Sequence, residues 1–171
     1  MPSQPSPNNL FDLAGRVAII TGGAGLLGRQ HAEAVASFGG IPVIWDTNYR
    51  GANEVAQSVG GLAFECDVTH PDYIHMTMLN TLSAMDHVDI LVNNVSCNAN
   101  VEALGPFSRL ENFPYTHWEA DLKLGLTSAF LCSKIIGGYM AKRGRGIIVN
   151  IASDLSVIAP DQRLYRKEGL E

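Results

Sequence analysis

The stretch Thr21-Gly22-Gly23-Ala24-Gly25-Leu26-Leu27-Gly28 decides the fold, because it joins a strand-like run to a helix-like one. Before it, Val17 to Ile20 is a short continuous apolar run, which is typical of a strand buried on both faces. After it, an alanine-rich helical pattern runs from Leu26 to Phe38. A Gly-x-Gly-x-x-Gly in this strand–turn–helix context is the fingerprint of a dinucleotide-binding turn.

The glycines of such a turn have separate physical roles. The early ones let the chain turn with positive φ, and a residue without a Cβ lets the backbone approach a pyrophosphate. Gly28 is expected to let the helix pack closely on the strand. Free N–H groups and the helix dipole then attract phosphates. The alternative interpretation is a plain glycine-rich turn between a strand and a helix.

Further apolar runs of strand length alternate with helical patterns along the chain. We expect strands at Ile41 to Trp45, Leu62 to Cys66, Val88 to Val92 and Ile147 to Ile151. We expect helices at 52–59, at 71–85 and at 116–140, the last with weak points at Gly125 and Gly137-Gly138. Strands joined by crossover helices form a parallel sheet with right-handed connections. We therefore predict an α/β domain at residues 13–153, between a flexible tail at 1–12 and a polar segment at 154–171.

Polar, acidic or glycine residues stand at the carboxyl ends of all five expected strands. They are Thr21-Gly22, Asp46, Cys66-Asp67, Asn93-Asn94 and Ala152-Ser153. Ligands of open parallel sheets bind beyond the carboxyl ends of the strands. This coincidence at one edge of the sheet supports a ligand site more strongly than any single motif.

Asp46 ends the second expected strand, 18 residues after Gly28. The dinucleotide fingerprint has an acidic residue at about that distance, which bonds the ribose 2′-OH. A carboxylate there repels a 2′-phosphate and so favours NAD, although Arg29 and Arg50 keep NADP open as an alternative. The other interpretation is that Asp46 caps a turn with the two residues that follow it.

Asp67 and Val68 follow the third expected strand. A short acid there can bond the exocyclic amine of adenine while the backbone of Val68 lines the ring. The alternative is that Asp67 forms an N-cap or an Asx-turn leading into Thr69-His70-Pro71.

Length and composition limit the class of protein. The chain has 171 residues, 46% of them apolar and 17% charged, which predicts one globular domain. Its net charge of −5 argues against nucleic acid as the main partner. It has no run of ~18 consecutive apolar residues, as a membrane helix requires, and no secretory signal. Cys66, Cys97 and Cys132 are widely spaced, which indicates reduced thiols in a cytoplasmic protein and no metal site.

Taken together, these motifs resemble the short-chain dehydrogenases/reductases. The matching pieces are 21–28, Asp46, Asp67-Val68, Asn93-Asn94-Val95-Ser96 and 148–153, in the order and spacing of that family. The resemblance implies a Rossmann-type, doubly wound parallel sheet. It also implies nicotinamide-dependent hydride transfer between an alcohol and a carbonyl, by a homo-oligomer.

The resemblance also implies a role for each site residue. The pyrophosphate would lie on Gly22, Gly25, Leu27 and Gly28. Asp46 would hold the adenosine ribose, Asp67 and Val68 the adenine, and Asn94 would contact the cofactor from the fourth strand. Ser153 would be the catalytic serine that orients the substrate by bonding the reacting oxygen.

Three departures from the family pattern affect the site. Leu26 stands where shorter members have the middle glycine, and Val95-Ser96 stands where they have Ala-Gly. Gly125 stands where the family commonly has an Asn that supports a water linked to the catalytic lysine.

The family's acid, a Tyr-x-x-x-Lys pair, is not in this chain. Tyr165 has the expected distance from Ser153, but Gly169 stands four positions after it. One explanation is that Tyr165 is a relic in a degenerate protein. The explanation we favour is that the pair lies beyond Glu171 and that the chain is the amino-terminal portion of a longer enzyme, inactive alone. The polar segment 154–171 would then be a loop or the truncated start of the catalytic region.

Two further functions remain as alternatives. One is a non-catalytic dinucleotide-binding module that has kept the glycine turn and lost the acid. The other is a fragment of an extended-branch nucleotide-sugar epimerase or dehydratase, suggested by the Thr-Gly-x-x-Gly-x-x-Gly spacing. Reading the coding frame past Glu171 separates the enzyme from the module.

Overall fold

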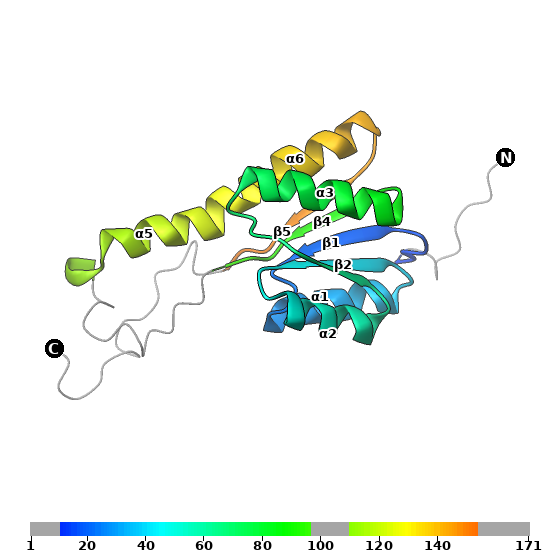
Figure 1. The fold of residues 1–171 in the computed structure, drawn as a ribbon, viewed down its shortest axis with the longest axis horizontal. Coiled ribbons are helices and arrows are strands. Elements are labelled where there is room, and N and C mark those ends of the chain that lie inside the picture. Colours follow the sequence, from blue (N-terminus) through cyan, green and yellow to red (C-terminus); the bar gives the residue numbers. More distant parts are fainter. Residues whose placement is uncertain (1–10, 97–109, 154–171) are drawn as a thin grey trace.

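Five parallel strands form one sheet in the computed structural model, which describes residues 11–96 and 110–153 (Figure 1). The strands are β1 (Val17–Thr21), β2 (Ile41–Asp46), β3 (Leu62–Glu65), β4 (Ile90–Asn93) and β5 (Ile147–Asn150). Their order in the sheet is β3-β2-β1-β4-β5, and every neighbouring pair is parallel. The strand order therefore reverses beside β1, where open α/β sheets bind their ligands.

Helices cover both faces of the sheet, as a doubly wound fold requires (Figure 1). One face carries α1 (Leu26–Ser37) and α2 (Tyr49–Val59), and the other carries α3 (Pro71–Met85) and α6 (Ser128–Lys142). Before α6 come the 3-10 turn η3 (Leu110–Asn112), α5 (Tyr115–Leu122) and the π-helical turn η4 (Lys123–Thr127). The predicted Rossmann-type α/β architecture is confirmed.

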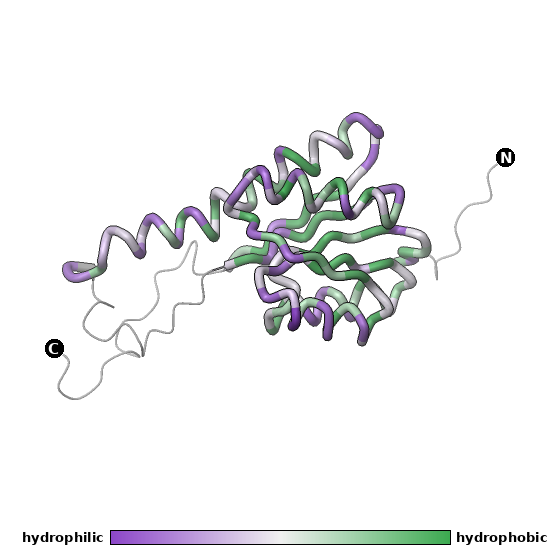
Figure 2. Tube along the Cα trace, in the orientation of Figure 1, coloured by the Kyte–Doolittle hydropathy of each residue, from purple (hydrophilic) through white to green (hydrophobic). Residues whose placement is uncertain are grey.

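Alternate residues of the strands build two separate cores. In β1, Val17 and Ile19 join the apolar cluster under α3 and α6, whereas Ala18 and Ile20 join the cluster under α1 and α2. All four are fully buried, as the continuous apolar run predicted, and the strands are apolar along most of their length (Figure 2). Trp45 fills the first cluster and donates its indole N–H to Thr81 Oγ1 at 3.1 Å.

Cys66 and Cys132 are buried core residues with free thiols. Burial raises the pKa of the Cys66 thiol to about 11 and that of Cys132 to about 12, so both stay protonated near neutral pH. Cys97 lies outside the described residues.

Two helices differ from their predicted bounds for local reasons. The second begins at Tyr49 rather than Ala52, because Asn48 Oδ1 accepts from the Gly51 N–H at 3.1 Å and caps it. The long helix begins at Tyr115 and passes through the π-helical turn at Gly125, one of its predicted weak points. Gly137-Gly138, the other one, lies inside an uninterrupted α6.

The helical stretch Tyr115–Lys142 is long and apolar enough, by length and composition, to cross a membrane. Its second half, however, packs on α3 and on β4 and β5 through Cys132, Ile136 and Met140. The core helix of a globular protein passes the same test, so this one helix is weak evidence for a membrane span. The predicted tail and polar segment fall largely or wholly outside the described residues.

Candidate functional site

A cavity of about 680 Å³ lies at the carboxyl edge of the sheet, and we call it the carboxyl-edge cavity. Its wall comes from the turns that follow β1, β2, β3 and β4, together with Leu124 of η4. All but one of the predicted cofactor-binding residues line it: Gly22, Gly25, Leu27, Asp46, Asp67, Val68 and Asn94. The residues selected from the sequence therefore share one cavity, while the contact of each residue with a cofactor stays a prediction.

Two predicted site residues do not line the cavity: Gly28, the remaining cofactor-binding residue, and Ser153, the predicted catalytic residue. Gly28 is buried in the first turn of α1. A Cβ at this position would overlap the Gly22 carbonyl oxygen and would lie 2.5 Å from Gly23 Cα, so the close packing predicted for Gly28 is confirmed. Ser153 is exposed and follows β5, at the same edge of the sheet.

The glycine turn has the backbone that its sequence predicted. Gly22 has a φ of 65°, in the left-handed region that favours glycine, and a Cβ there would lie 3.1 Å from the side chain of Val95. Gly25 is the N-cap of α1, and no side chain caps it. The first turn of α1 also carries no acidic residue, so its N–H groups remain available beside the cavity.

Asp46 uses both carboxylate oxygens at the end of β2. Oδ2 accepts from the Ala24 N–H at 3.0 Å and so ties the glycine turn to β2. Oδ1 accepts from the Asn48 N–H at 2.9 Å, which is the turn-capping role of the alternative interpretation. The two interpretations are compatible, because each carboxylate oxygen has further lone pairs and Asp46 still lines the cavity.

Asp67 forms the Asx-turn that its alternative interpretation predicted. Its Oδ1 accepts from the Thr69 N–H at 2.9 Å and from the Thr69 hydroxyl at 2.7 Å. Burial raises the pKa of the Asp67 carboxyl, but these hydrogen bonds, with His70 and Lys123 nearby, outweigh it and hold the pKa below its ordinary value. Asp67 is therefore an anion at neutral pH that lines the cavity in a fixed orientation.

Asn93 and Asn94 were predicted as a pair, and the structure gives them different partners. Asn94 donates its side-chain amide to the carbonyl oxygens of Thr21 at 3.1 Å and of Gly22 at 3.2 Å, so it supports the glycine turn. Asn93 points to the other side and donates to Asn150 Oδ1 at 2.8 Å and to Ser133 Oγ at 3.0 Å. Successive residues of a strand face opposite sides, which explains the division.

Sequence reasoning missed Thr21 and Asn150 as supports of the site. The Thr21 hydroxyl oxygen accepts from the Asn94 backbone N–H at 3.1 Å, and its hydroxyl donates to the Val92 carbonyl at 3.3 Å, which locks β1 to β4. Asn150 stands opposite Asn93 in the register of β4 and β5. The available signal was the polar residue type of each at or near the carboxyl end of an apolar strand.

Comparison with known proteins agrees with this geometry. The family described as short chain dehydrogenase matches residues 16–165. The chain belongs to this family. Among curated relatives, the D-threitol dehydrogenase of Mycolicibacterium smegmatis is 32% identical over 90% of this chain, and the NAD-dependent glycerol dehydrogenase of Listeria innocua is 31% identical over 90%. The chain spans 58% and 59% of the length of these short-chain dehydrogenases.

A solved structure has the same fold. The structure described as ribose-5-phosphate isomerase from Brucella melitensis matches with a TM-score of 0.78 and 26% identity, covering 86% of this chain and 55% of that one. The name of that protein is an isomerase name, whereas the family match and the named relatives are dehydrogenases and reductases. A shared fold alone does not decide a reaction, so the family match rather than this fold match guides the function proposed below.

Proposed function

We propose that this short-chain dehydrogenase supplies the NAD-binding half of an enzyme that transfers a hydride between an alcohol and a carbonyl. The nicotinamide provides the hydride chemistry, and the protein provides binding, orientation and electrostatics. In this proposal the enzyme is a cytoplasmic homo-oligomer with a small-molecule substrate. No nucleic acid or membrane takes part.

The start of α1 carries the proposal. Its N-cap is Gly25, no side chain caps it, and Leu26 and Leu27 of its first turn line the carboxyl-edge cavity. An uncapped helix start with the positive end of the helix dipole suits a diphosphate, which accepts from the N–H groups there. The cavity volume of about 680 Å³ also falls within the roughly 300–1,000 Å³ of small-molecule sites.

The carboxylates of the cavity support NAD as the cofactor. Asp46 lines the cavity at the end of β2, where the fingerprint acid bonds a ribose hydroxyl and repels a 2′-phosphate. Asp67 follows β3 and is held in its ionised form, in which both of its oxygens can accept from an adenine amine. One of the named relatives, the glycerol dehydrogenase of Listeria innocua, is NAD-dependent by name.

A calorimetric titration tests this proposal. Wild type is expected to bind NAD more tightly than NADP. Asp46→Asn is expected to weaken NAD binding about tenfold, because a hydrogen bond to a charged group contributes about 1.5–3 kcal/mol, and to reduce the preference over NADP. Glu33→Gln, which removes an exposed acid of α1 outside the cavity, is the matched control and is expected to change nothing. Binding that is undetectable in wild type, or equal in Asp46→Asn, would refute the proposal.

A second candidate function is a dinucleotide-binding module without catalysis, and the sequence favours it in one respect. The chain contains Ser153, the proposed substrate-orienting residue, but no Tyr-x-x-x-Lys. For the 171-residue chain alone, we expect NAD binding without reduction of NAD in the presence of any alcohol. Turnover by the longer protein read from the same coding frame would exclude the module, whereas binding without turnover there would exclude the enzyme.

A further inference from the structure

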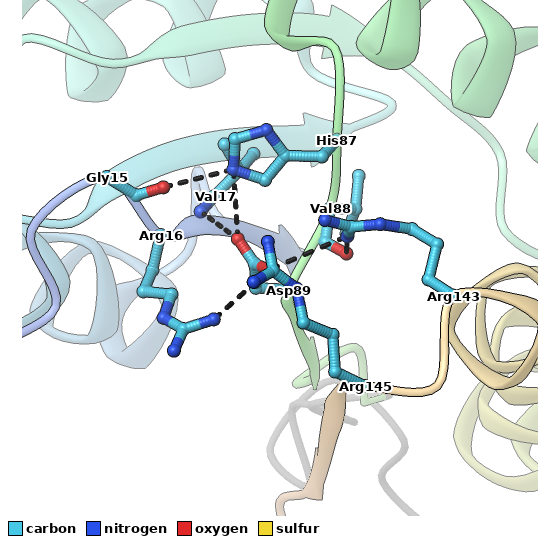
Figure 3. A network of polar contacts seen from close by, with 8 residues as sticks. All are labelled: Gly15, Arg16, Val17, His87, Val88, Asp89, Arg143 and Arg145. Atoms are coloured by element: carbon cyan, nitrogen blue, oxygen red, sulfur yellow. Dashed lines mark hydrogen bonds and ion pairs between the residues drawn. The ribbon is translucent and has the colours of Figure 1, made fainter. Parts of the chain in front are cut away.

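A cluster of charged side chains lies at the amino edge of the sheet, at the opposite end of the strands from the carboxyl-edge cavity. Asp89 is at its centre, directly before β4, and its side chain is 3% exposed (Figure 3). Arg16 comes directly before β1, and Arg143 and Arg145 lie in the turn between α6 and β5 (Figure 3). Three segments that are distant in sequence therefore meet at one carboxylate.

Three guanidinium groups converge on the same oxygen of this carboxylate. Asp89 Oδ1 lies 3.4 Å from Arg16 Nη1, 3.4 Å from Arg145 Nη2 and 3.5 Å from Arg143 Nη1. Within the part of the chain that the structure describes, no other carboxylate lies within ion-pair distance of these arginines. One negative charge therefore stands against three positive charges, in a chain whose net charge is −5. The excess is local and positive.

The three arginines differ in their polar partners and in the exposed fraction of each side chain. Arg143 donates to the Val88 carbonyl at 2.8 Å, lies over the Tyr139 ring and is 23% exposed, so its place is structural. Arg16 and Arg145 are 46% and 55% exposed. A guanidinium has five N–H donors, and in residues 11–96 and 110–153 the polar partner of each of these two side chains is Asp89 alone. Each side chain therefore has N–H donors left over for a ligand.

We propose that Arg16 and Arg145 form a binding site for a phosphate group at the amino edge of the sheet. Both guanidiniums are held beside the same Asp89 oxygen, so their bonded nitrogens are no more than twice 3.4 Å apart. A phosphate group spans that separation with charge-assisted hydrogen bonds of about 2.8 Å to each side. Two bound guanidiniums also supply the planar fork that suits phosphate oxygens.

Asp89 is a positioning residue in this site. Its Oδ2 accepts from the Val17 N–H at 3.1 Å and lies 3.1 Å from His87 Nε2, so this oxygen already has its own partners. Its Oδ1 fixes the two arginine side chains before the ligand arrives, which lowers the ordering entropy lost on binding. Arg145, but not Arg16, also lines an open cavity of about 330 Å³ next to Gly144 and Gly146, so a ligand can approach the site from the Arg145 side.

A nitrogen-15 NMR titration of the 171-residue chain with inorganic phosphate tests the site, at ionic strength held constant with sodium chloride. The Nε–H signals of Arg16 and Arg145 are expected to shift and saturate. The Leu27 amide reports separately on phosphate that enters the carboxyl-edge cavity. Arg145→Gln is expected to weaken saturation at the Arg16 signal about tenfold, because one of two charge-assisted partners is lost.

Two further variants keep the result interpretable. Lys134→Gln removes an exposed positive charge of α6 that is outside the cluster, and it is expected to leave phosphate binding within about twofold of wild type. If circular dichroism shows that Arg145→Gln melts at a lower temperature than wild type, Arg16→Gln is used instead. Phosphate binding to that variant is then followed at the Arg145 signal. Shifts that rise without saturation, or that are equal in the arginine variants and in Lys134→Gln, would overturn the proposal.

Discussion

Asp89 also holds the amino ends of three strands together. Its carboxylate accepts from Val17 of β1, its backbone carbonyl accepts from Ile147 of β5, and it leads directly into β4. Asp89→Asn keeps the shape of the side chain and removes its charge. We expect the free energy of unfolding to fall by about 1–3 kcal/mol at pH 7, the range for leaving buried groups unsatisfied. Urea denaturation measures this difference.

The pH dependence of the same pair of proteins follows from the Asp89 pKa. Burial raises the pKa of this carboxyl, but the Val17 N–H, His87 and the arginines outweigh burial and hold it below its ordinary value. Its contribution is therefore fully present above the unfolded-state pKa of about 3.9 and is lost as the pH falls through the lower folded-state value. The difference between wild type and Asp89→Asn should be constant near neutral pH and should shrink below about pH 4–5. A difference that stays constant into acid would contradict this origin.

The sequence predicted the residues of the cavity better than their contacts. Asp46 and Asp67 were identified from their positions at strand ends, and both line the cavity. Their turn contacts with Asn48 and Thr69 were identified only as alternatives, although the structure has both features together. Side-chain partners across the sheet, such as Asn93 with Asn150, depend on strand register. The pattern of one strand fixes which face each residue takes but does not name the residue opposite it on a distant strand.

Glycine has two different roles between β1 and α1, close packing at Gly28 and access to the helix start at Gly25. Alanine substitutions can distinguish these roles. A Cβ at Gly28 would overlap the Gly22 carbonyl oxygen, whereas one at Gly25 would lie 3.3 Å from that atom. We expect Gly28→Ala to lower the free energy of unfolding by about 1–3 kcal/mol, as overpacking does. Gly25→Ala is expected to retain most of the stability and to weaken NAD binding, because its Cβ would stand beside the uncapped N–H groups of α1.

Gly138→Ala is the matched control for these substitutions. Nothing lies within 4 Å of a Cβ at this position inside α6, so alanine is expected to stabilise the helix by about 0.5–1 kcal/mol and to leave NAD binding unchanged. Thermal melts and calorimetric titrations of the three variants provide both measurements. If Gly28→Ala melted like wild type, close packing of α1 on β1 would not be the reason for glycine at that position.

Helices and strands were predictable to the extent that their signals are local. The continuous apolar run Val17–Ile20 identified a strand buried on both faces, and the alternation of strands and helices identified a parallel sheet. The π-helical turn at 123–127 was anticipated only as a weak point at Gly125. There the Ser128 hydroxyl donates to the Leu124 carbonyl, a contact that satisfies a backbone oxygen inside the altered turn. No periodic pattern of side chains encodes such a contact.

The central strand of the sheet is buried and its edge strand β5 is exposed, and this exposure favours association with another chain. β1 is buried at every position, whereas Ile147, Ile148 and Val149 of β5 are 60%, 39% and 40% exposed. Among the described residues, β5 pairs with β4 on one side and with no strand on its other side. An apolar edge strand with free N–H and C=O groups is a template for pairing with another chain.

We therefore expect the 171-residue chain to self-associate as its concentration rises, and we expect Val149→Lys to shift it toward monomer. A lysine on an edge strand leaves the backbone unchanged. Its charge must lose water when a second strand pairs there, so pairing becomes less favourable. Leu79→Lys places the same charge on an exposed apolar position of α3, which is 60% exposed, and serves as the control. Sedimentation velocity over a concentration series measures both variants. If Leu79→Lys dissociated the chain as effectively as Val149→Lys, general charge repulsion rather than the β5 edge would account for association.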